Sequence, residues 1–369
     1  MTRLRRATTL VASIDGSRLR IHNFLDQSAF LCAPGWLAPL AELSEWTERE
    51  EAIEIFRRHG SEDAASDIEQ LTAVGALVAE GSEGAGRDEV YRATWEWGPI
   101  AGLYHFGTRD IPFADEAEEA EFLAARGEQR PSPALWAEDG KGAIRLAAPA
   151  LADEADLLET IFSRRSLRNL LPGGHLALAD LGTCLAAGGR VLGTIELPLR
   201  GRLPLKPAPS GGARNPFEIY LDARAVEWLE PGVYRYGGQT HSLTPLTHSD
   251  GPPFSELVGG QEWANPSAAV LFLVAYWERP AWKYVAPSTY GSVLIEAGHI
   301  AQNVLLAATA LGLANAVSAA LLHHAVERRL GVDGIERSAI YAIALGEIDP
   351  AGDPLAFVAP DESAGASRP

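Results

Sequence analysis

Apolar residues in the first part of the chain recur at spacings that predict one strand and several short helices. Residues 19–23 form an extended pattern, whereas residues 39–46, 51–58 and 64–74 carry apolar side chains at helical spacing. The last of these helices runs into the Gly-Ala-Leu-Val sequence of residues 75–78, a glycine stop followed by a strand. The pattern predicts a small strand-and-helix module.

Beyond about residue 150 the pattern changes to longer helices and more strands. The run at 268–276 is apolar throughout, as expected for a strand covered on both faces. The stretch 293–311 is apolar nearly all round, so this helix should lie inside the core or in a subunit interface. The mixture predicts an α+β domain. The predicted helices are 153–162, 178–187 and 293–311, and the predicted strands are 217–221, 233–236, 241–246, 268–276 and 339–345.

Shifts in composition mark the expected domain boundaries. Residues 88–109 are dense in aromatic side chains, which is typical of packing at a domain junction. Residues 115–121 supply five carboxylates, and residues 130–149 are rich in Pro, Ala and Gly. We therefore expect a winged-helix-like N-terminal module at 1–110, an acidic and proline-rich linker at 111–155, the α+β domain at 156–358 and a disordered tail at 359–369.

The charge balance disfavours two classes of partner. The 369 residues include 31 basic and 49 acidic side chains, which gives a net charge of −18. Nucleic-acid backbones and anionic membrane surfaces should therefore be repelled. Helices that enter DNA are normally basic, whereas the N-terminal module is rich in Glu and Asp. We expect that module to bind a peptide or to serve a structural purpose.

Cysteine usage and the apolar segments predict a cytoplasmic protein. Cys32 and Cys184 are far apart and show no disulfide or zinc-binding spacing. Residues 1–10 are not followed by the continuous apolar core of a signal peptide. Polar side chains interrupt the apolar stretch 293–322, which is poor material for a lipid-facing span. We expect neither export nor membrane insertion.

A group of cations follows the helix predicted at 153–162. Arg164, Arg165, Ser166 and Arg168 could bind a phosphate dianion through charge-assisted, bidentate hydrogen bonds. The same residues could instead be a solvated helix end that complements the helix dipole. The segment alone leaves both interpretations open.

A turn-rich stretch precedes the first predicted strand of the α+β domain. It contains Pro209, Ser210, Gly211, Gly212 and Asn215. Small residues let backbone groups approach a flat ligand closely, and the polar side chains can bind its edge. On spacing alone, an ordinary loop is the simpler interpretation.

Lys283 and Tyr284 follow the buried strand predicted at 268–276. A lysine beside a tyrosine can stabilise the phenolate, which makes a phenol usable as a general base at neutral pH. Adjacent Lys-Tyr pairs also arise by chance, and sequence neighbours can point apart. The pair gains meaning only in a wider pattern.

For the other polar residues, structural roles are the simpler interpretation. His299 and Gln302 lie three residues apart in the helix predicted at 293–311, so a polar network inside the core is the simplest explanation. His323 and His324 lack further ligands at metal-binding spacing and are expected on a helix surface. The sequence also lacks the GxxxxGK[ST], GxGxxG and GxSxG fingerprints, which leaves nucleotide-triphosphate, Rossmann and α/β-hydrolase assignments unsupported.

Taken together and in order, several segments resemble the nitroreductase superfamily, and within it the SagB-type dehydrogenases that form thiazoles and oxazoles. An RRSxR segment at 164–168 is followed by a PSxGAxxP segment at 209–216 and a YxYxxxxHxL hairpin at 234–243. A Lys-Tyr pair at 283–284 and an EAGHxxQN segment within 296–313 complete the order. The joint pattern is more specific than any of its parts.

The resemblance, which covers about residues 156–348, implies an α+β, nitroreductase-like fold that binds flavin mononucleotide (FMN) without a Rossmann motif. It also implies a homodimer with the flavin at the subunit interface. The implied site residues are Arg164, Ser166 and Arg168 at the phosphate, with Arg165 beside them; Ser210, Gly211 and Gly212 along the ring, flanked by Pro209 and Asn215; and Lys283 with Tyr284 as the catalytic pair.

The same resemblance implies oxidation of a thiazoline or oxazoline to an azole in a ribosomally made peptide. A base at Lys283 or Tyr284 would remove the Cα proton while a hydride passes from Cβ to the flavin. A modified precursor peptide and a cyclodehydratase are the implied partners. Three alternatives stay open: another peptide-derived or small substrate, a nitro compound reduced with NAD(P)H, and a non-catalytic scaffold in a peptide-modifying complex. The electron acceptor, dioxygen or nicotinamide, is open as well.

Overall fold

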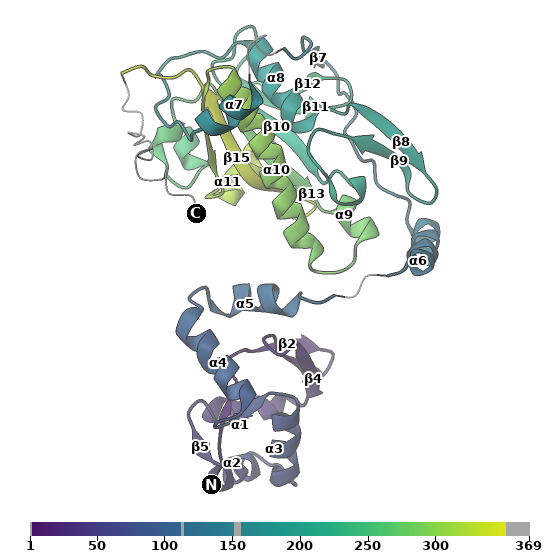
Figure 1. Ribbon diagram of the computed structural model, residues 1–369, viewed down its shortest axis with the longest axis vertical. Coiled ribbons are helices and arrows are strands. Elements are labelled where there is room, and N and C mark those ends of the chain that lie inside the picture. The colour runs from purple at the N-terminus through teal and green to yellow at the C-terminus, as the bar shows by residue number, and fades with distance from the viewer. Residues whose placement is uncertain (1, 112–113, 151–155, 352–369) are drawn as a thin grey trace, which may run out of the picture. The chain divides into compact units, whose positions relative to one another are not determined.

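The chain folds into two compact units (Figure 1). The structure, a computed structural model, describes residues 2–111, 114–150 and 156–351. The N-terminal unit comprises residues 1–113 together with 286–288, and the C-terminal unit comprises the rest of the chain. The boundary therefore falls within the stretch that we expected to be a linker.

Two small antiparallel sheets and a set of helices form the N-terminal unit. Its elements are β1 (Arg3–Arg6), β2 (Leu10–Asp15), β3 (Arg18–Asn23), β4 (Ser28–Cys32), η1 (Pro34–Trp36), α1 (Leu37–Glu42), β5 (Thr47–Glu48), α2 (Arg49–Arg58), α3 (Ala64–Ala73), β6 (Leu77–Ala79), α4 (Glu83–Thr94) and α5 (Gly98–Gly107). Strand β1 lies between β5 and β6, and β3 lies between β2 and β4. Helices α2 and α3 bury Phe56, Ile68 and Leu71, which explains their helical apolar spacing. The winged-helix-like interpretation of this unit stays a prediction.

A seven-stranded antiparallel sheet with helices on both faces forms the C-terminal unit. Its elements are α6 (Glu116–Gln129), β7 (Ile144–Arg145), α7 (Leu157–Ser163), α8 (Leu178–Gly189), β8 (Gly193–Leu197), β9 (Gly201–Leu205), η2 (Gly211–Ala213), β10 (Phe217–Ala223), β11 (Gly232–Gly237), β12 (Ser242–Thr247), η3 (Phe254–Glu256), η4 (Glu262–Ala264), β13 (Ala269–Tyr276), α9 (Glu278–Lys283), α10 (Thr289–Ala310), β14 (Ala314–Ser318), α11 (His323–Leu330) and β15 (Arg337–Gly346). The strand order is β14-β15-β13-β10-β11-β12-β7, and β8 pairs with β9 in a separate hairpin. The predicted α+β fold is confirmed.

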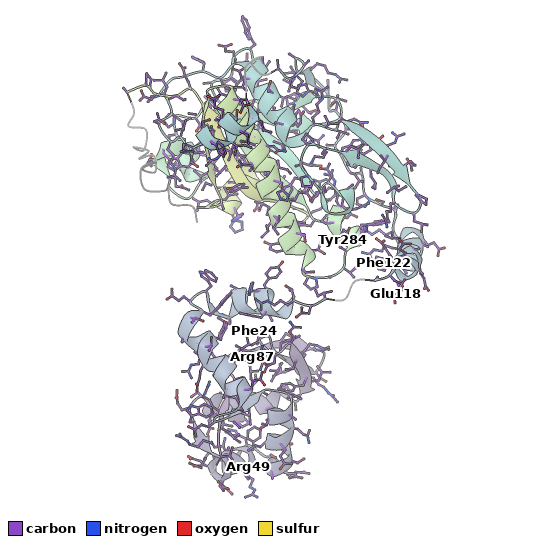
Figure 2. All side chains as sticks on the ribbon, viewed as in Figure 1. Phe24, Arg49, Arg87, Glu118, Phe122 and Tyr284 are labelled. Atoms are coloured by element: carbon purple, nitrogen blue, oxygen red, sulfur yellow. The ribbon has the colours of Figure 1, made fainter. Side chains whose placement is uncertain are left out.

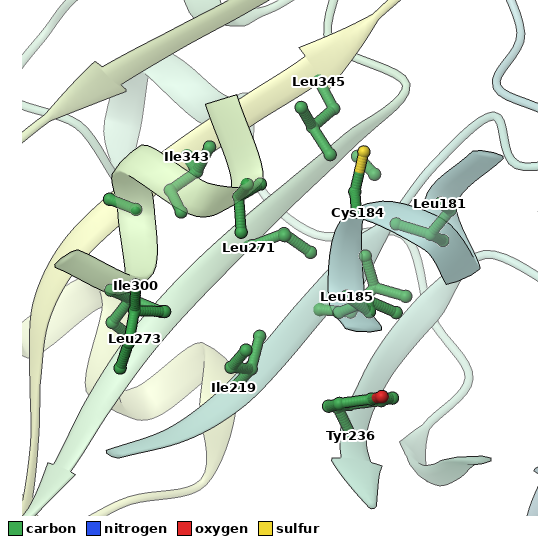
Figure 3. Close-up of a cluster of buried hydrophobic side chains, with 14 of the residues drawn as sticks. Leu181, Cys184, Leu185, Ile219, Tyr236, Leu271, Leu273, Ile300, Ile343 and Leu345 are labelled. Atoms are coloured by element: carbon green, nitrogen blue, oxygen red, sulfur yellow. The ribbon is translucent and has the colours of Figure 1, made fainter. Parts of the chain in front are cut away.

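Strand β13 lies in the middle of the sheet and is buried on both faces. Leu271 and Leu273 point into the cluster that contains Ile300 of α10 (Figure 3), whereas Phe272 points into a second cluster with Val326 of α11. Successive side chains of a strand point to opposite faces, so a strand between two helical layers has to be apolar throughout. This is the physical basis of the unbroken apolar run in the sequence.

Helix α10 buries only one of its sides. Ile300 and Val304 are fully buried, whereas the side chain of Ile295 is 63% exposed. His299 and Gln302 are exposed, so the internal polar network predicted for them is wrong. The helical repeat carries both side chains away from the face that packs on the sheet. Among the described residues, α10 alone has the length and composition of a membrane span, a test that buried core helices also pass.

The stretch expected to be a linker, residues 111–155, contains regular structure. Helix α6 begins at a capping box formed by Asp115 and Glu118, and it buries Leu123. Strand β7 pairs with β12 at the edge of the large sheet. The acidic composition therefore reflects the polar surface of a helix rather than an unstructured connection. The tail predicted at 359–369 lies outside the described residues.

Candidate functional site

The loop before β10 has a constrained backbone. Gly212, Ala213 and Asn215 have φ angles of 56°, 53° and 48°, all in the left-handed region. The Asn215 backbone N–H donates a 2.9 Å hydrogen bond to Ser210 Oγ, which closes the loop, and Pro209 is exposed at its start. A left-handed backbone costs a non-glycine residue roughly 1–3 kcal/mol and persists where the surroundings enforce it, often at functional sites.

Lys283 and Tyr284 lie against this loop. Helix α9 follows the central strand β13 and ends at Lys283. It places Lys283 and Tyr284 beside Gly212. A Cβ atom on Gly212 would lie 3.1 Å from Lys283 Nζ and would overlap the Tyr284 hydroxyl. Lys283 Nζ also lies 4.8 Å from the centroid of the Tyr284 ring. The structure thus brings together two segments that are about 70 residues apart in the sequence, and their contact requires a glycine at position 212.

Helix α6 contributes a carboxylate that contacts Lys283. Lys283 Nζ forms an ion pair with Glu119 Oε1 at 2.9 Å, and Arg200 Nη2 donates a 2.6 Å hydrogen bond to Glu119 Oε2. Figure 2 labels Glu118 and Phe122 on the same helix, α6. The pKa of Glu119 is lowered, chiefly by the hydrogen bond from Lys283. Glu119 was not predicted as a site residue, because it is one of five carboxylates in a stretch expected to be a linker.

A buried arginine lies behind the pair. Arg214 donates to Ser132 Oγ at 2.8 Å and to the Arg279 carbonyl at 2.9 Å, and its guanidinium lies 4.7 Å from the centroid of the Trp282 ring. Burial lowers the pKa of Arg214 to about 10, an effect that the nearby Tyr284 opposes. Its Nη1 atom has no hydrogen-bond partner in the described part of the chain. Arg214 is thus a buried cation with one donor still available.

A titratable pair supports the loop from its inner side. Glu296 of α10 is buried, which raises its pKa to about 7 against the opposing effects of Lys206, Ser210 and the Gly211 backbone. Lys206 Nζ donates a 2.5 Å hydrogen bond to Asn215 Oδ1, and burial lowers the pKa of Lys206 to about 8. Glu296 belongs to the EAGHxxQN segment, and no role was predicted for its carboxylate.

The basic segment lies at the other end of α10. The Leu167 N–H donates a 2.8 Å hydrogen bond to the carbonyl of Asn315 in β14, the strand that follows α10. In Figure 1, α7 lies beside the upper part of α10, whereas α9 lies beside its lower part. Within one chain, the segment is therefore not brought to the loop and the Lys-Tyr pair.

The side chains of the basic segment are open to solvent to different degrees. Arg164 and Ser166 are half-buried, whereas Arg165 and Arg168 are exposed. Arg165 donates 2.8 Å hydrogen bonds to the carbonyls of Phe162 and Arg164. The Arg168 guanidinium lies 5.3 Å from the centroid of the Trp263 ring, in reach of a cation–π contact.

Elsewhere in the C-terminal unit, a cavity of about 340 Å³ is lined by Arg235, Arg279 and Arg337 among others. None of the predicted site residues lines it. Within the ranges that the structure describes, no group of three or more His, Cys, Asp and Glu side chains could hold a metal ion. The candidate site is therefore the loop with its Lys-Tyr pair, together with the separate basic segment.

Comparison with known proteins identifies the family of the C-terminal unit. The sequence profile of the Nitroreductase family matches residues 161–347, about half of the chain. MJ1384 of Methanocaldococcus jannaschii, a protein classed with the nitroreductases, is 35% identical over 162 residues, which are 44% of this chain and 77% of MJ1384. A crystal structure of a protein from Ralstonia eutropha, classed in the same way, aligns with a TM-score of 0.47 and 21% identity over 60% of this chain and 98% of that chain.

Two relatives are named as processing proteins. The trifolitoxin-processing protein TfxB of Rhizobium leguminosarum bv. trifolii is 28% identical over 157 residues, 41% of this chain and 42% of TfxB. The microcin B17-processing protein McbC of Escherichia coli is 29% identical over 135 residues, 35% of this chain and 49% of McbC. The chain thus matches about half of each relative. Nitroreductase-family proteins are in general flavin oxidoreductases. The predicted family is confirmed: this chain belongs to the nitroreductase family.

Proposed function

We propose that the chain is an FMN-dependent dehydrogenase that oxidises an azoline in a ribosomally made peptide to an azole. The observation that carries the proposal is the contact of Lys283 and Tyr284 with Gly212 in a chain of the nitroreductase family. Support for a peptide substrate comes from TfxB and McbC, which are named as processing proteins of trifolitoxin and microcin B17.

The loop has the features that a flavin ring requires. A Cβ atom on Gly211 would meet no atom within 4 Å, so the outer surface of the loop is open at this position. At Gly212 even a Cβ atom would fill the space beside the Lys-Tyr pair. We assign the ring to this surface, lined by Ser210 and the two glycines and flanked by Pro209 and Asn215. FMN, when bound, accepts a hydride at its flavin N5 atom.

The phosphate would be held by the basic segment. Arg164, Ser166 and Arg168 supply two guanidinium groups and a hydroxyl, with Arg165 next to them. Because this segment and the loop lie at different ends of α10 in one chain, we propose that the chain forms a homodimer. In it, the loop of one copy and the basic segment of the other would together bind one FMN molecule.

The Lys-Tyr pair would supply the base for the reaction. The Cα–H bond of the azoline breaks, its proton passes to Lys283 or Tyr284, and its electron pair forms the new ring double bond. The Cβ–H bond breaks so that both of its electrons leave with the hydrogen, as hydride. The protein therefore has to place the acidic Cα–H within hydrogen-bonding distance of the pair while the Cβ–H faces the ring.

The test is oxidation of a synthetic thiazoline peptide by the FMN-loaded protein, followed by mass spectrometry for the loss of two hydrogens. Tyr284→Phe and Lys283→Ala should each lower the rate by about 10² to 10⁴-fold and leave FMN bound. Lys141→Ala is the matched control, since Lys141 is an exposed lysine outside the site. Full activity in either variant of the pair would refute the assignment.

A second candidate is an NAD(P)H-dependent nitroreductase. The similarity to MJ1384, at 35% identity, favours it. Anaerobic mixing of the FMN-loaded protein with NADPH separates the two functions, because rapid bleaching of the flavin absorbance is expected only from the reductase. A protein that binds no FMN in this assay would instead favour a scaffold role in a peptide-modifying complex.

The proposed reaction also suggests partners and a location. A modified precursor peptide would be the substrate, and a cyclodehydratase would make the azoline that this chain oxidises. The acidic N-terminal unit is the candidate for binding the unmodified part of the peptide. Both enzymes and the peptide would meet in the cytoplasm. Co-purification of the chain with a precursor peptide, compared with residues 114–369 alone, would test the role of the N-terminal unit.

A further inference from the structure

A carboxylate outside the family domain reaches the proposed catalytic pair. Glu119 of α6 precedes residue 161, where the match to the Nitroreductase family begins. Its Oε1 atom lies 2.9 Å from Lys283 Nζ, and its Oε2 atom accepts a 2.6 Å hydrogen bond from Arg200 Nη2. One carboxylate thus bridges two cations on separate elements, α9 and the turn between β8 and β9.

Helix α6 is fixed at both of its ends. The capping box that begins at Asp115 stabilises its first turn. At its other end, the Arg130 carbonyl accepts a 2.9 Å hydrogen bond from Trp282 Nε1, and the Arg130 guanidinium pairs with Glu278. Trp282 immediately precedes Lys283 and Glu278 begins α9, so α6 is anchored to the same short helix that carries the lysine.

Lys283 depends on this carboxylate for its place. Its side chain is only 7% exposed, and in the described part of the chain Glu119 is the one carboxylate that pairs with it. On its other sides it meets the Tyr284 ring and Gly212. A buried ammonium without a partner is costly, so a lysine freed from Glu119 would turn toward water and away from the tyrosine.

We infer that Glu119 is a positioning residue that holds the Lys283 ammonium against Tyr284, so that Lys283 acts as a fixed cation and Tyr284 accepts the proton of the substrate. The reaction roles in this inference rest on the proposed function, whereas the bridge itself does not. Arg200 orients the carboxylate from the other side. Because Lys283 and Arg200 lower the pKa of Glu119, the carboxylate stays charged throughout the neutral range.

Because the chain contains few lysines, the ion pair between Glu119 and Lys283 can be tested by chemical labelling of each lysine. The sequence contains three lysines, Lys141, Lys206 and Lys283. A brief pulse of acetic anhydride at about neutral pH acetylates accessible, unpaired amines, and peptide mass spectrometry gives a rate for each lysine. Exposed Lys141 is the internal reference. In Glu119→Gln, which keeps the shape of the side chain but removes its charge, Lys283 should react about tenfold faster relative to Lys141.

Three further variants define the effect. Glu121→Gln is the matched control, since Glu121 is exposed on the same helix, and it should leave the labelling unchanged. Arg200→Ala should raise the labelling of Lys283 by a smaller factor than Glu119→Gln. In the FMN-loaded protein with a thiazoline peptide, Glu119→Gln should lower kcat about tenfold with little change in KM. Glu119→Asp, which restores the charge, should recover part of both effects.

The positioning role and the proposed function can fail separately. Unchanged labelling of Lys283 in Glu119→Gln would overturn the positioning role, whatever the activity. Faster labelling with an unchanged kcat would overturn it too, because the reaction would then not depend on the place of the ammonium. Faster labelling together with full activity in Lys283→Ala would instead leave the bridge intact and remove the catalytic pair.

Discussion

The two halves of the proposed FMN site differ in how completely contacts within one chain fix their side chains. In the ring half, Ser210 closes a left-handed loop, and Glu119 fixes Lys283 beside Gly212. In the phosphate half, Arg168 is exposed, and its guanidinium lies over the Trp263 ring. The first half is held by contacts within the chain, whereas the second has donors that are still available to a ligand.

This difference has a physical reason. A base has to sit in one place before the substrate arrives, so its partners must come from the protein itself. A phosphate-binding arginine must instead keep its donors free, because a carboxylate partner from the protein would compete with the phosphate. In the described ranges neither Arg164 nor Arg168 forms an ion pair, in contrast to Lys283 and Arg200. Preorganised and open regions can therefore both indicate a site.

The largest effect should come from filling the ring half. In Gly212→Val the new side chain would meet Lys283 and Tyr284 and would also have to adopt a φ of 56°. FMN affinity should fall by more than about 100-fold, and turnover should be lost with it. Quenching of FMN fluorescence measures the affinity. Gly127→Val is the control, because a Cβ atom there meets nothing within 4 Å; tight FMN binding in Gly212→Val would remove the ring from this loop.

The next effect tests the phosphate half. Removal of two charge-assisted hydrogen-bonding groups in the double variant Arg164→Ala with Arg168→Ala should weaken FMN binding by about 10- to 100-fold. Riboflavin, which lacks the phosphate, should bind the variant as well as it binds the unaltered protein. Arg328→Ala, at an exposed arginine on α11, should change neither affinity. An equal loss for both ligands would mean that the segment supports the fold rather than the phosphate.

A third prediction concerns the two copies. If each FMN site uses one half from each chain, Gly212→Val damages one half and the double arginine variant damages the other. A mixture of the two proteins, exchanged through partial unfolding and assayed at an FMN concentration too low to fill either variant, should then regain about a quarter of the activity, because half of the dimers are mixed and each mixed dimer has one intact site. Sites contained within single chains would regain nothing. Sedimentation of the unmixed proteins checks that both remain dimers.

The elements that could be predicted from the sequence are those with a buried face. Strand β13 and helix α10 show in the pattern because both pack in the core. The hairpin of β8 and β9 was missed because Ile195 and Leu205 remain exposed although Leu203 is buried, so the apolar positions of the hairpin do not mark a consistently buried face. Helix α6 was missed because Leu123 is its one buried side chain. An element that buries many residues shows a hydrophobic pattern in the sequence, whereas an element that is held by a few contacts does not.

The same distinction applies to the candidate site: residues in motifs could be predicted, whereas contacts between distant segments could not. The loop and the Lys-Tyr pair could be named from their motifs, but their contact depends on the backbone at Gly212, which no spacing encodes. Glu296 did carry a signal, because it lies three residues after Val293 and four before Ile300, on the core face of α10. A carboxylate at such a position predicts a buried charge. Glu119 carried none, since its partners lie far away in the sequence.

The smallest predicted effect tests whether the ring half is stable without a ligand. The pKa of Glu296 is raised to about 7 in the folded apo-protein, so its contribution to stability is full below about pH 4.5 and is lost as the pH rises through 7. Lys206, whose pKa is lowered to about 8, acts in the opposite sense, and its unfavourable contribution is relieved above that pH. Arg279 adds positive charge near Lys206. We therefore expect a minimum of stability near pH 7 to 8.

The variant Glu296→Gln isolates the carboxyl group in this minimum. Urea unfolding of the apo-protein at several pH values should show a free energy that falls between pH 5 and 7, by at most about 3 kcal/mol, and this fall should be absent in Glu296→Gln. Glu227→Gln, at an exposed position, should keep the fall. FMN should raise the free energy of unfolding of the unaltered protein at each pH, because it would bind the folded state. Equal slopes in the variant and the unaltered protein would mean that the loop is held by Ser210 and Asn215 alone, without a titrating carboxyl beneath it.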